Sequence, residues 1–128
     1  MPFITLYMQR GCKDADIEKS MKEITEAGEE ILENTLKRMI RVTVLEADPD
    51  RVYKNGEKEE KLAPTVVFRI GPGRSAEAKD RFMKRISEIL QTNLGCEASQ
   101  VRAYVMDNED GHHFCIGGKH KDFGKKVK

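Results

Sequence analysis

The stretch that decides the fold covers residues 64–75 and reads PTVVFRIGPGRS. It starts with a proline, continues with six residues that favour a strand, and ends in a glycine-rich turn before Ser75, a residue type that caps helices. Beyond the turn, apolar residues recur at helical spacing, namely Phe82, Ile86, Ile89, Leu90 and Leu94. A second strand is expected over residues 101–106. This order predicts one strand–helix–strand unit.

The same pattern occurs earlier in the chain. Residues 2–8, PFITLYM, predict a strand that stops at Gly11. Apolar residues at helical spacing then predict a helix over residues 14–34, and residues 40–45 predict another strand. Asn55-Gly56, which follows, is a strong signal for a two-residue hairpin turn. The chain therefore contains the strand–helix–strand pattern twice.

The spacing between the two copies is nearly constant. It is 62 or 61 residues in the pairs Pro2 and Pro64, Gly11 and Gly73, and Arg41 and Arg102. We therefore expect two tandem βαβ repeats, a first half (residues 1–61, with a connector) and a second half (residues 62–128, with a basic tail), packed as one compact domain. The expected fold is α+β, with a parallel-stranded sheet, helices on one face and hairpins at the ends.

Composition narrows the class of protein. The chain has 128 residues, 38% of them hydrophobic and 35% charged, and a net charge of +1. No apolar run approaches the roughly 18 residues of a membrane span, so we expect a cytoplasmic protein without a membrane partner. The near-neutral charge argues against nucleic acid as a partner. A core this small favours oligomer formation.

Particular motifs carry a family resemblance. In the second half they are the leading Pro64, Gly73-Arg74-Ser75 at the turn, Val101-Arg102 at the second strand and Phe114 to Gly118 in a hairpin. With these features the second half resembles a complete subunit of 4-oxalocrotonate tautomerase (4-OT). The first half resembles it less closely and keeps Pro2, Gly11 and Arg41. The chain is thus similar to a fused, two-subunit member of the tautomerase superfamily.

The resemblance implies an activity and an assembly. It implies a cofactor-independent keto–enol tautomerase that acts on small 2-hydroxydienoate or enolpyruvate-type carboxylates. The family uses an amino-terminal proline as general base, with arginines that hold the substrate carboxylate. Family sites combine residues of several subunits in a hexamer, so a fused chain is expected to form a homotrimer, a pseudo-hexamer.

Only one of the two prolines can be the base. Removal of Met1 frees the amine of Pro2, whereas the nitrogen of Pro64 is a tertiary amide inside the chain. Apolar surroundings and nearby arginines would lower the pKa of the Pro2 amine, because both disfavour its charged form. The turn arginine, Arg74, has Cys12 as its counterpart in the first half. We therefore expect one competent site per chain, which joins Pro2 to Arg74.

The remaining site residues follow from the resemblance. Arg102 and Tyr104 lie two apart, hence on one face of the expected strand, and are assigned to the site of a neighbouring chain, where Arg102 is a catalytic residue that holds a carboxylate or polarises a keto oxygen. Tyr104 would donate to the same oxygen, and Arg41 is the alternative for the arginine role. Phe114 would form the apolar wall beside Pro2.

Two departures limit the chemistry. The related 3-chloroacrylic acid dehalogenases carry a further arginine three residues before the turn arginine and a glutamate two residues after the hairpin phenylalanine. Gly71 and Ile116 occupy these positions here, which disfavours hydrolytic dehalogenation.

Other functions have weaker support. His112-His113 lacks the cysteine or carboxylate spacing that a metal site needs, so no metal is expected. Lysines of the basic tail suggest a nucleic-acid-binding protein as one alternative, without the aromatic platform that such binding uses. A catalytically silent scaffold of the superfamily is the other alternative.

Overall fold

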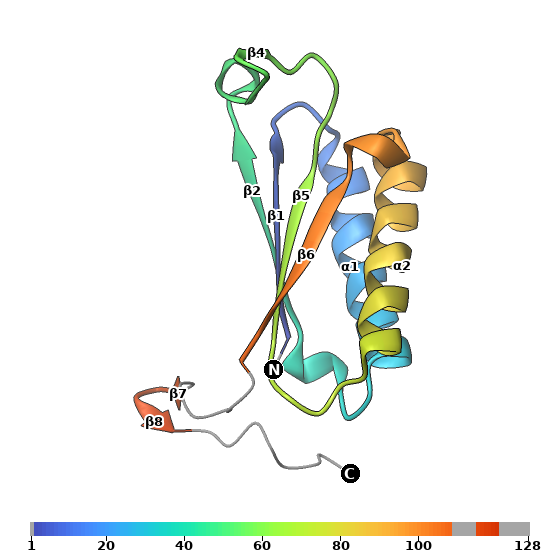
Figure 1. The fold of residues 1–128 in the computed structure, drawn as a ribbon, viewed down its shortest axis with the longest axis vertical. Helices are drawn as coiled ribbons and strands as arrows, with labels where there is room; N and C mark the ends of the chain where they lie inside the picture. Colours follow the sequence, from blue (N-terminus) through green and yellow to red (C-terminus); the bar gives the residue numbers. More distant parts are fainter. Residues whose placement is uncertain (1, 109–114, 121–128) are drawn as a thin grey trace.

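The computed structural model describes residues 2–108 and 115–120, and its first half forms a strand–helix–strand unit followed by a hairpin (Figure 1). The elements are β1 (Phe3–Gln9), α1 (Asp14–Ile31), the 3-10 turn η1 (Lys37–Met39), β2 (Arg41–Ala47), the 3-10 turn η2 (Pro49–Arg51), β3 (Tyr53–Lys54) and β4 (Glu57–Lys58). The second half repeats this order with β5 (Thr65–Ile70), α2 (Ala76–Leu94), the 3-10 turn η3 (Ala98–Gln100), β6 (Arg102–Asp107), β7 (Cys115–Ile116) and β8 (Lys119–His120).

The four long strands form one sheet in the order β2-β1-β5-β6. Within each half the strands are parallel, with Phe3 opposite Arg41 and Thr65 opposite Arg102. Between the halves β1 and β5 run antiparallel, with Phe3 opposite Arg69. The expectation of two βαβ repeats is confirmed, and the antiparallel junction relates them by a pseudo-twofold rotation.

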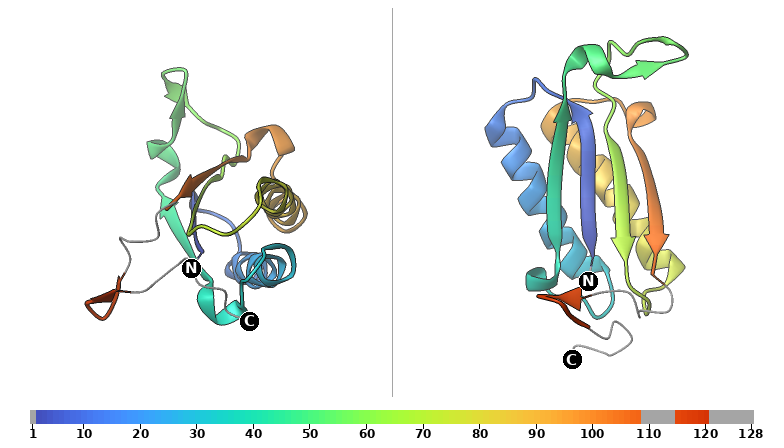
Figure 2. Two further views of the ribbon diagram at one scale, coloured as in Figure 1. Left: turned by 60° about the horizontal axis from the view of Figure 1, so that its bottom comes forward. Right: turned by 90° about the vertical axis from the view of Figure 1, so that its left-hand side faces the viewer.

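Both helices cover the same face of the sheet (Figure 2). Helix α2 begins where expected, because the Ser75 side chain accepts a hydrogen bond from the Ala78 N–H. Helix α1 ends at Ile31 rather than at residue 34. The chain becomes extended at Leu32, whose side chain is buried in the core, so burial of this residue replaces the last expected turn.

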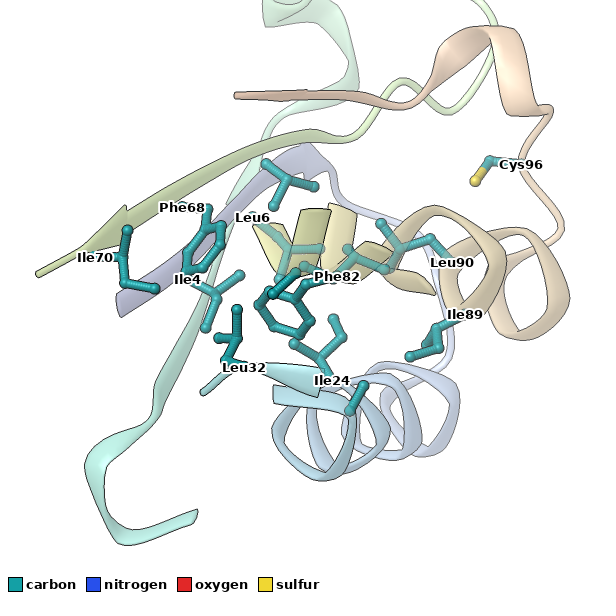
Figure 3. Close-up of a cluster of buried hydrophobic side chains, with 14 residues drawn as sticks. Ile4, Leu6, Ile24, Leu32, Phe68, Ile70, Phe82, Ile89, Leu90 and Cys96 are labelled. Carbon is teal, nitrogen blue, oxygen red and sulfur yellow. The ribbon is translucent and has the colours of Figure 1, made fainter. Parts of the chain in front are cut away.

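The core lies between the sheet and the helices (Figure 3). Alternate residues of β1 and β5 point into it, including Ile4 and Leu6 from the first half and Phe68 from the second. The rings of Phe68 and Phe82 meet edge to face with centroids 5.0 Å apart, which is a favourable aromatic geometry. The two halves therefore share one hydrophobic core.

The opposite face of the sheet is not covered by helices (Figure 2). It carries large apolar side chains that are 41–52% exposed, namely Tyr7, Leu45, Tyr104 and Met106. Large apolar side chains exposed together on one face of a sheet are typical of an interaction surface in soluble proteins. We refer to these four residues as the open sheet face.

Two short hairpins follow the long strands. Asn55 and Gly56 turn β3 into β4 with φ values of 56° and 76°, as the Asn-Gly signal predicts. Gly117 and Gly118 turn β7 into β8, also with positive φ. No helix in the described part of the chain is both long and apolar enough to cross a bilayer.

Candidate active site

Pro2 lies immediately before β1 and is buried. Its carbonyl oxygen accepts a hydrogen bond from the Arg41 N–H at 3.1 Å, which fixes the start of β1 against the start of β2. Pro64 repeats this arrangement, since its carbonyl accepts the Arg102 N–H at 3.0 Å. The two prolines are therefore equivalent in backbone geometry, and they differ in whether the nitrogen can become a free amine.

The antiparallel junction determines which turn each proline approaches. Because Phe3 pairs with Arg69, Pro2 lies at the end of the sheet where β5 leads into the turn of Arg74. Tyr7 pairs with Thr65 at the other end, where Pro64 starts β5 and β1 leads toward Cys12. The structure thus brings Pro2 and the Arg74 turn to one end of the molecule, seen at the bottom of Figure 1.

Arg74 is held by the chain segment that follows α1. Its Nε donates to the Glu33 carbonyl at 3.0 Å and its Nη2 donates to the Asn34 carbonyl at 3.1 Å. Both nitrogens also donate to the Thr35 hydroxyl, at 3.2 and 3.0 Å. Nη1 donates to the Pro72 carbonyl at 3.1 Å. A side chain of the second half is therefore fixed by backbone and hydroxyl groups of the first.

The electrostatics of this turn favour a fixed cation. Burial lowers the pKa of the Arg74 guanidinium, and the charge of the Glu33 carboxylate opposes that shift. Hydrogen bonding from Ser75 lowers the pKa of Glu33, whose Oε1 accepts the Ser75 N–H at 3.1 Å, and the charge of Arg74 lowers it further. An arginine remains protonated under such conditions. The end of the sheet that holds Pro2 therefore carries a permanently charged guanidinium, with the ionised Glu33 carboxylate near it.

The other candidate residues of the strands project from the open face of the sheet. Arg41, Arg102 and Tyr104 are exposed. Arg41 lies beside Pro2 through the β1–β2 pairing, whereas Arg102 pairs with Thr65 at the opposite end. At about 3.3 Å per residue, the strands separate Arg102 from Pro2 by roughly 15–20 Å. A single chain therefore does not bring Arg102 to Pro2.

Phe114, the expected apolar wall, lies outside the described residues, and so does the His112-His113 pair. Gly71 is buried at the end of β5, and Ile116 belongs to β7. Among residues 2–108 and 115–120 no group of three histidine, cysteine or acidic side chains is arranged to hold a metal ion.

The opposite end of the sheet has a different chemistry. A cavity of about 480 Å³ lies there, lined by residues that include Arg10, Cys12, Lys13, Asp16, Lys58 and Glu59. Burial raises the pKa of the Cys12 thiol, and the carboxylates of Glu46 and Asp16 raise it further. Arg10, which directly precedes Gly11, is exposed and pairs with Asp48 at 3.8 Å. This end offers a protonated thiol among mixed charges.

Sequence reasoning missed the segment that holds Arg74. Thr35 is only 1% exposed, and the carbonyls of Glu33 and Asn34 act through the backbone. No sequence motif predicts such contacts, because every residue type has the same backbone carbonyl acceptor. The one available signal was the end of the first helix, after which the chain is free to contact Arg74. The sequence predicted this end at residue 34, three residues later than Ile31, where the structure has it.

Comparisons with solved structures identify the fold. A wild-type fused 4-OT in an asymmetric trimer matches with a TM-score of 0.83 and 18% identity, over 92% of this chain and 94% of the other. Native fused 4-OT matches with a TM-score of 0.82 and 20% identity over the same shares. A member of the cis-3-chloroacrylic acid dehalogenase family matches with a TM-score of 0.82 and 16% identity, over 95% and 85%.

Sequence comparison alone does not find these similarities. No protein-family model matches the chain, and no curated protein matches it significantly. At 15–20% identity the structural matches establish that the chain has the fold shared by fused 4-OT and the cis-3-chloroacrylic acid dehalogenase family.

Proposed function

We propose that this chain is a cofactor-independent keto–enol tautomerase that acts on small 2-hydroxydienoate or enolpyruvate-type carboxylates. Its general base is the amine of Pro2, freed by removal of Met1. One observation carries the proposal: the antiparallel β1–β5 junction groups Pro2 with the fixed cation of Arg74, and groups Pro64 with Cys12 at the other end. The only proline that can become an amine is therefore the one at the end of the sheet that holds the turn arginine.

The chemistry follows from these two groups. The positive charge of Arg74 and the burial of Pro2 both favour the neutral amine, because each disfavours adding a proton. The neutral nitrogen takes the hydroxyl proton of the enol. As the carbonyl forms, the electron pair of the carbon–carbon double bond takes a proton from the prolinium at carbon. Arg74 and Arg102 hold the carboxylate and the oxygen on which negative charge develops.

The proposed enzyme is a homotrimer. Arg102 lies at the far end of the sheet from Pro2 in its own chain, so a second copy must supply it. Arg102 projects from the same side of the sheet as the open sheet face, to which Tyr104 belongs. The exposed apolar side chains of this face give a trimer apolar surface to bury. In this assembly Tyr104 donates to the substrate oxygen, Arg41 is the alternative arginine, and Phe114 lines the site.

A catalytically silent scaffold is the second candidate. The bonds that Arg74 makes within the chain favour it, because an arginine engaged by four acceptor groups has a structural role without any substrate. This candidate predicts no turnover with any enol substrate. It also predicts that protein with Met1 and protein without Met1 are equally inactive.

The test is an ultraviolet assay of enol-to-keto conversion with 2-hydroxymuconate and phenylenolpyruvate, together with intact-mass analysis. We expect the mass to show loss of Met1, and Pro2→Ala to lower kcat by about 10²–10⁴-fold, the usual contribution of a positioned general base.

Pro64→Ala is the matched control, since Pro64 has the same backbone contact but no free amine. We expect it to retain kcat within about twofold of the wild-type value, which is a small effect beside that of a general base. Full turnover by Pro2→Ala, or by protein that keeps Met1, would contradict the proposed function.

A further inference from the structure

We propose that Thr35 is a positioning residue for Arg74, and that it leaves one guanidinium N–H, on Nη1, for a single substrate oxygen. This inference rests on the proposed function for its catalytic part. Its structural part, that the Thr35 hydroxyl orients the guanidinium, is measurable without substrate. The observations that carry it are the five hydrogen bonds of Arg74 and the burial of Thr35.

The direction of each hydrogen bond defines the role of Thr35. Its hydroxyl donates its only proton to the Glu33 carbonyl at 2.9 Å. The oxygen lone pairs therefore face Arg74 and accept from Nε and Nη2. Because Thr35 is only 1% exposed, water does not compete for these lone pairs. The hydroxyl is thus a dedicated acceptor for the guanidinium.

A count of N–H groups shows what Arg74 has left. A guanidinium carries five: one on Nε and two on each Nη. The single group on Nε, both on Nη2 and one on Nη1 have acceptors among the described residues. The second N–H on Nη1 has no acceptor among the described residues. Arg74 therefore gives a substrate one hydrogen bond and a positive charge, not the two parallel bonds of a bidentate carboxylate pair.

This division changes what each arginine does in the proposed site. A single N–H from Arg74 suits one oxygen, either the one that gains charge or one oxygen of a carboxylate. The second carboxylate oxygen then needs a donor from elsewhere, and in the proposed trimer that donor is Arg102. The acceptors around Arg74 fix the direction of its free N–H before substrate arrives, which lowers the entropic cost of binding.

The equivalent segment of the second half has no such arrangement. A spacing of 62 residues relates Arg74 to Cys12, and the spacing of 61 between η1 and η3 relates Thr35 to Cys96. The arginine and its hydroxyl acceptor are thus both replaced by cysteines, and there is no guanidinium to position. The positioning contact therefore exists only at the end of the sheet that holds Pro2.

The experiment uses three variants of the full-length protein. Thr35→Val keeps the side-chain volume and removes the acceptor, and we expect KM to rise about tenfold with kcat within about threefold of the wild-type value. Thr35→Ser keeps the hydroxyl and restores KM. Thr25→Val is the matched control, because the Thr25 hydroxyl only donates to the Met21 carbonyl within α1. We expect it to leave both constants unchanged.

An NMR measurement separates the structural part from the catalytic part. In protein labelled with ¹⁵N-arginine, we expect a slowly exchanging Nη2–H signal from Arg74 that is lost in Thr35→Val and kept in Thr35→Ser and Thr25→Val, whereas the Nε–H keeps the Glu33 carbonyl as an acceptor in all of them. An unchanged signal in Thr35→Val overturns the positioning role. A wild-type protein that shows this signal but converts no substrate counts against the proposed function instead. A fall in kcat alone, with KM unchanged, also overturns the positioning role.

Discussion

The turn after β5 and the turn after β1 occupy equivalent places in the two halves but differ in chemistry. The first holds Arg74, bound through four N–H groups to neighbouring acceptors. The second holds Cys12, which lines a cavity of about 480 Å³. Identical subunits must keep every site residue in each copy. Two halves joined in one chain are free to diverge, so the turn arginine can remain in one half and the free amine in the other.

The helices differ between the halves in a similar, complementary way. Phe82 of α2 packs close to Gly28 of α1, where an added Cβ would lie 3.4 Å from the phenylalanine ring. The spacing of 62 residues relates these two positions to Ser20 and Leu90, both buried. The position that holds the small Gly28 in α1 thus holds the larger Leu90 in α2. The position that holds the large Phe82 in α2 holds the small Ser20 in α1. The asymmetry of the turns therefore extends into the shared core.

Between the two turns, the largest expected effect comes from comparing Arg74→Ala with Cys12→Ala. We expect Arg74→Ala to lower kcat/KM by about 10–100-fold, because a hydrogen bond to a charged group contributes roughly 1.5–3 kcal/mol and each 1.4 kcal/mol is a factor of ten. It also leaves the carbonyls of the α1–η1 segment without donors, at a cost in stability of about 1–3 kcal/mol.

Cys12→Ala provides the other arm of that comparison. We expect kcat/KM to stay at the wild-type value and stability to change by less than about 1 kcal/mol, since the thiol makes no hydrogen bond that the fold requires. Steady-state kinetics and urea denaturation measure both quantities. Equal losses in the two variants would show that the halves have not diverged in function.

Much of the fold was predictable from the sequence because apolar spacing and turn residues are local signals. Ser75 and the Asn55-Gly56 turn act on their immediate neighbours, and the structure confirms both. The antiparallel junction between the halves was not predicted, because repeat spacing says nothing about how two units are oriented. Leu32 shows the same limit, since the helix ends where tertiary burial is gained rather than where the pattern fades.

The candidate site was predictable only in part. Pro2 and Arg74 carry recognisable chemistry, and the resemblance to 4-OT pointed to them. Thr35 did not stand out, because its role depends on a guanidinium that lies 39 residues further along the chain. The assignment of Arg102 remains a prediction, since one chain contains only its own copy at the far end of the sheet.

An intermediate effect is expected from the helix caps of the two halves. Ser75 caps α2 through its side chain, whereas Lys13 at the start of α1 makes no such bond. We expect Ser75→Ala to destabilise the protein by about 1 kcal/mol and Lys13→Ser to stabilise it by up to about 1 kcal/mol, because a serine oxygen satisfies a free helix N–H. Urea denaturation measures both changes. The comparison fails if Lys13→Ser destabilises the protein.

The smallest expected effect concerns Glu33, whose counterpart at a spacing of 62 residues is Gly95. Hydrogen bonding from Ser75 lowers the pKa of Glu33 in the folded state. Its contribution to stability is therefore fully present above the unfolded value of about 4.3 and is lost as the pH falls through the lower folded value. The carboxylate is exposed, so solvent screening keeps the contribution small.

Glu33→Gln tests this sign directly. The amide still accepts the Ser75 N–H but carries no charge, so we expect it to be less stable than the wild-type protein at pH 7. As the pH falls below about 4.3 the wild-type carboxylate gains a proton, and the two free energies of unfolding converge. Denaturation at a series of pH values measures the difference. A difference that grows toward low pH would mean that the Arg74 turn does not stabilise the Glu33 charge.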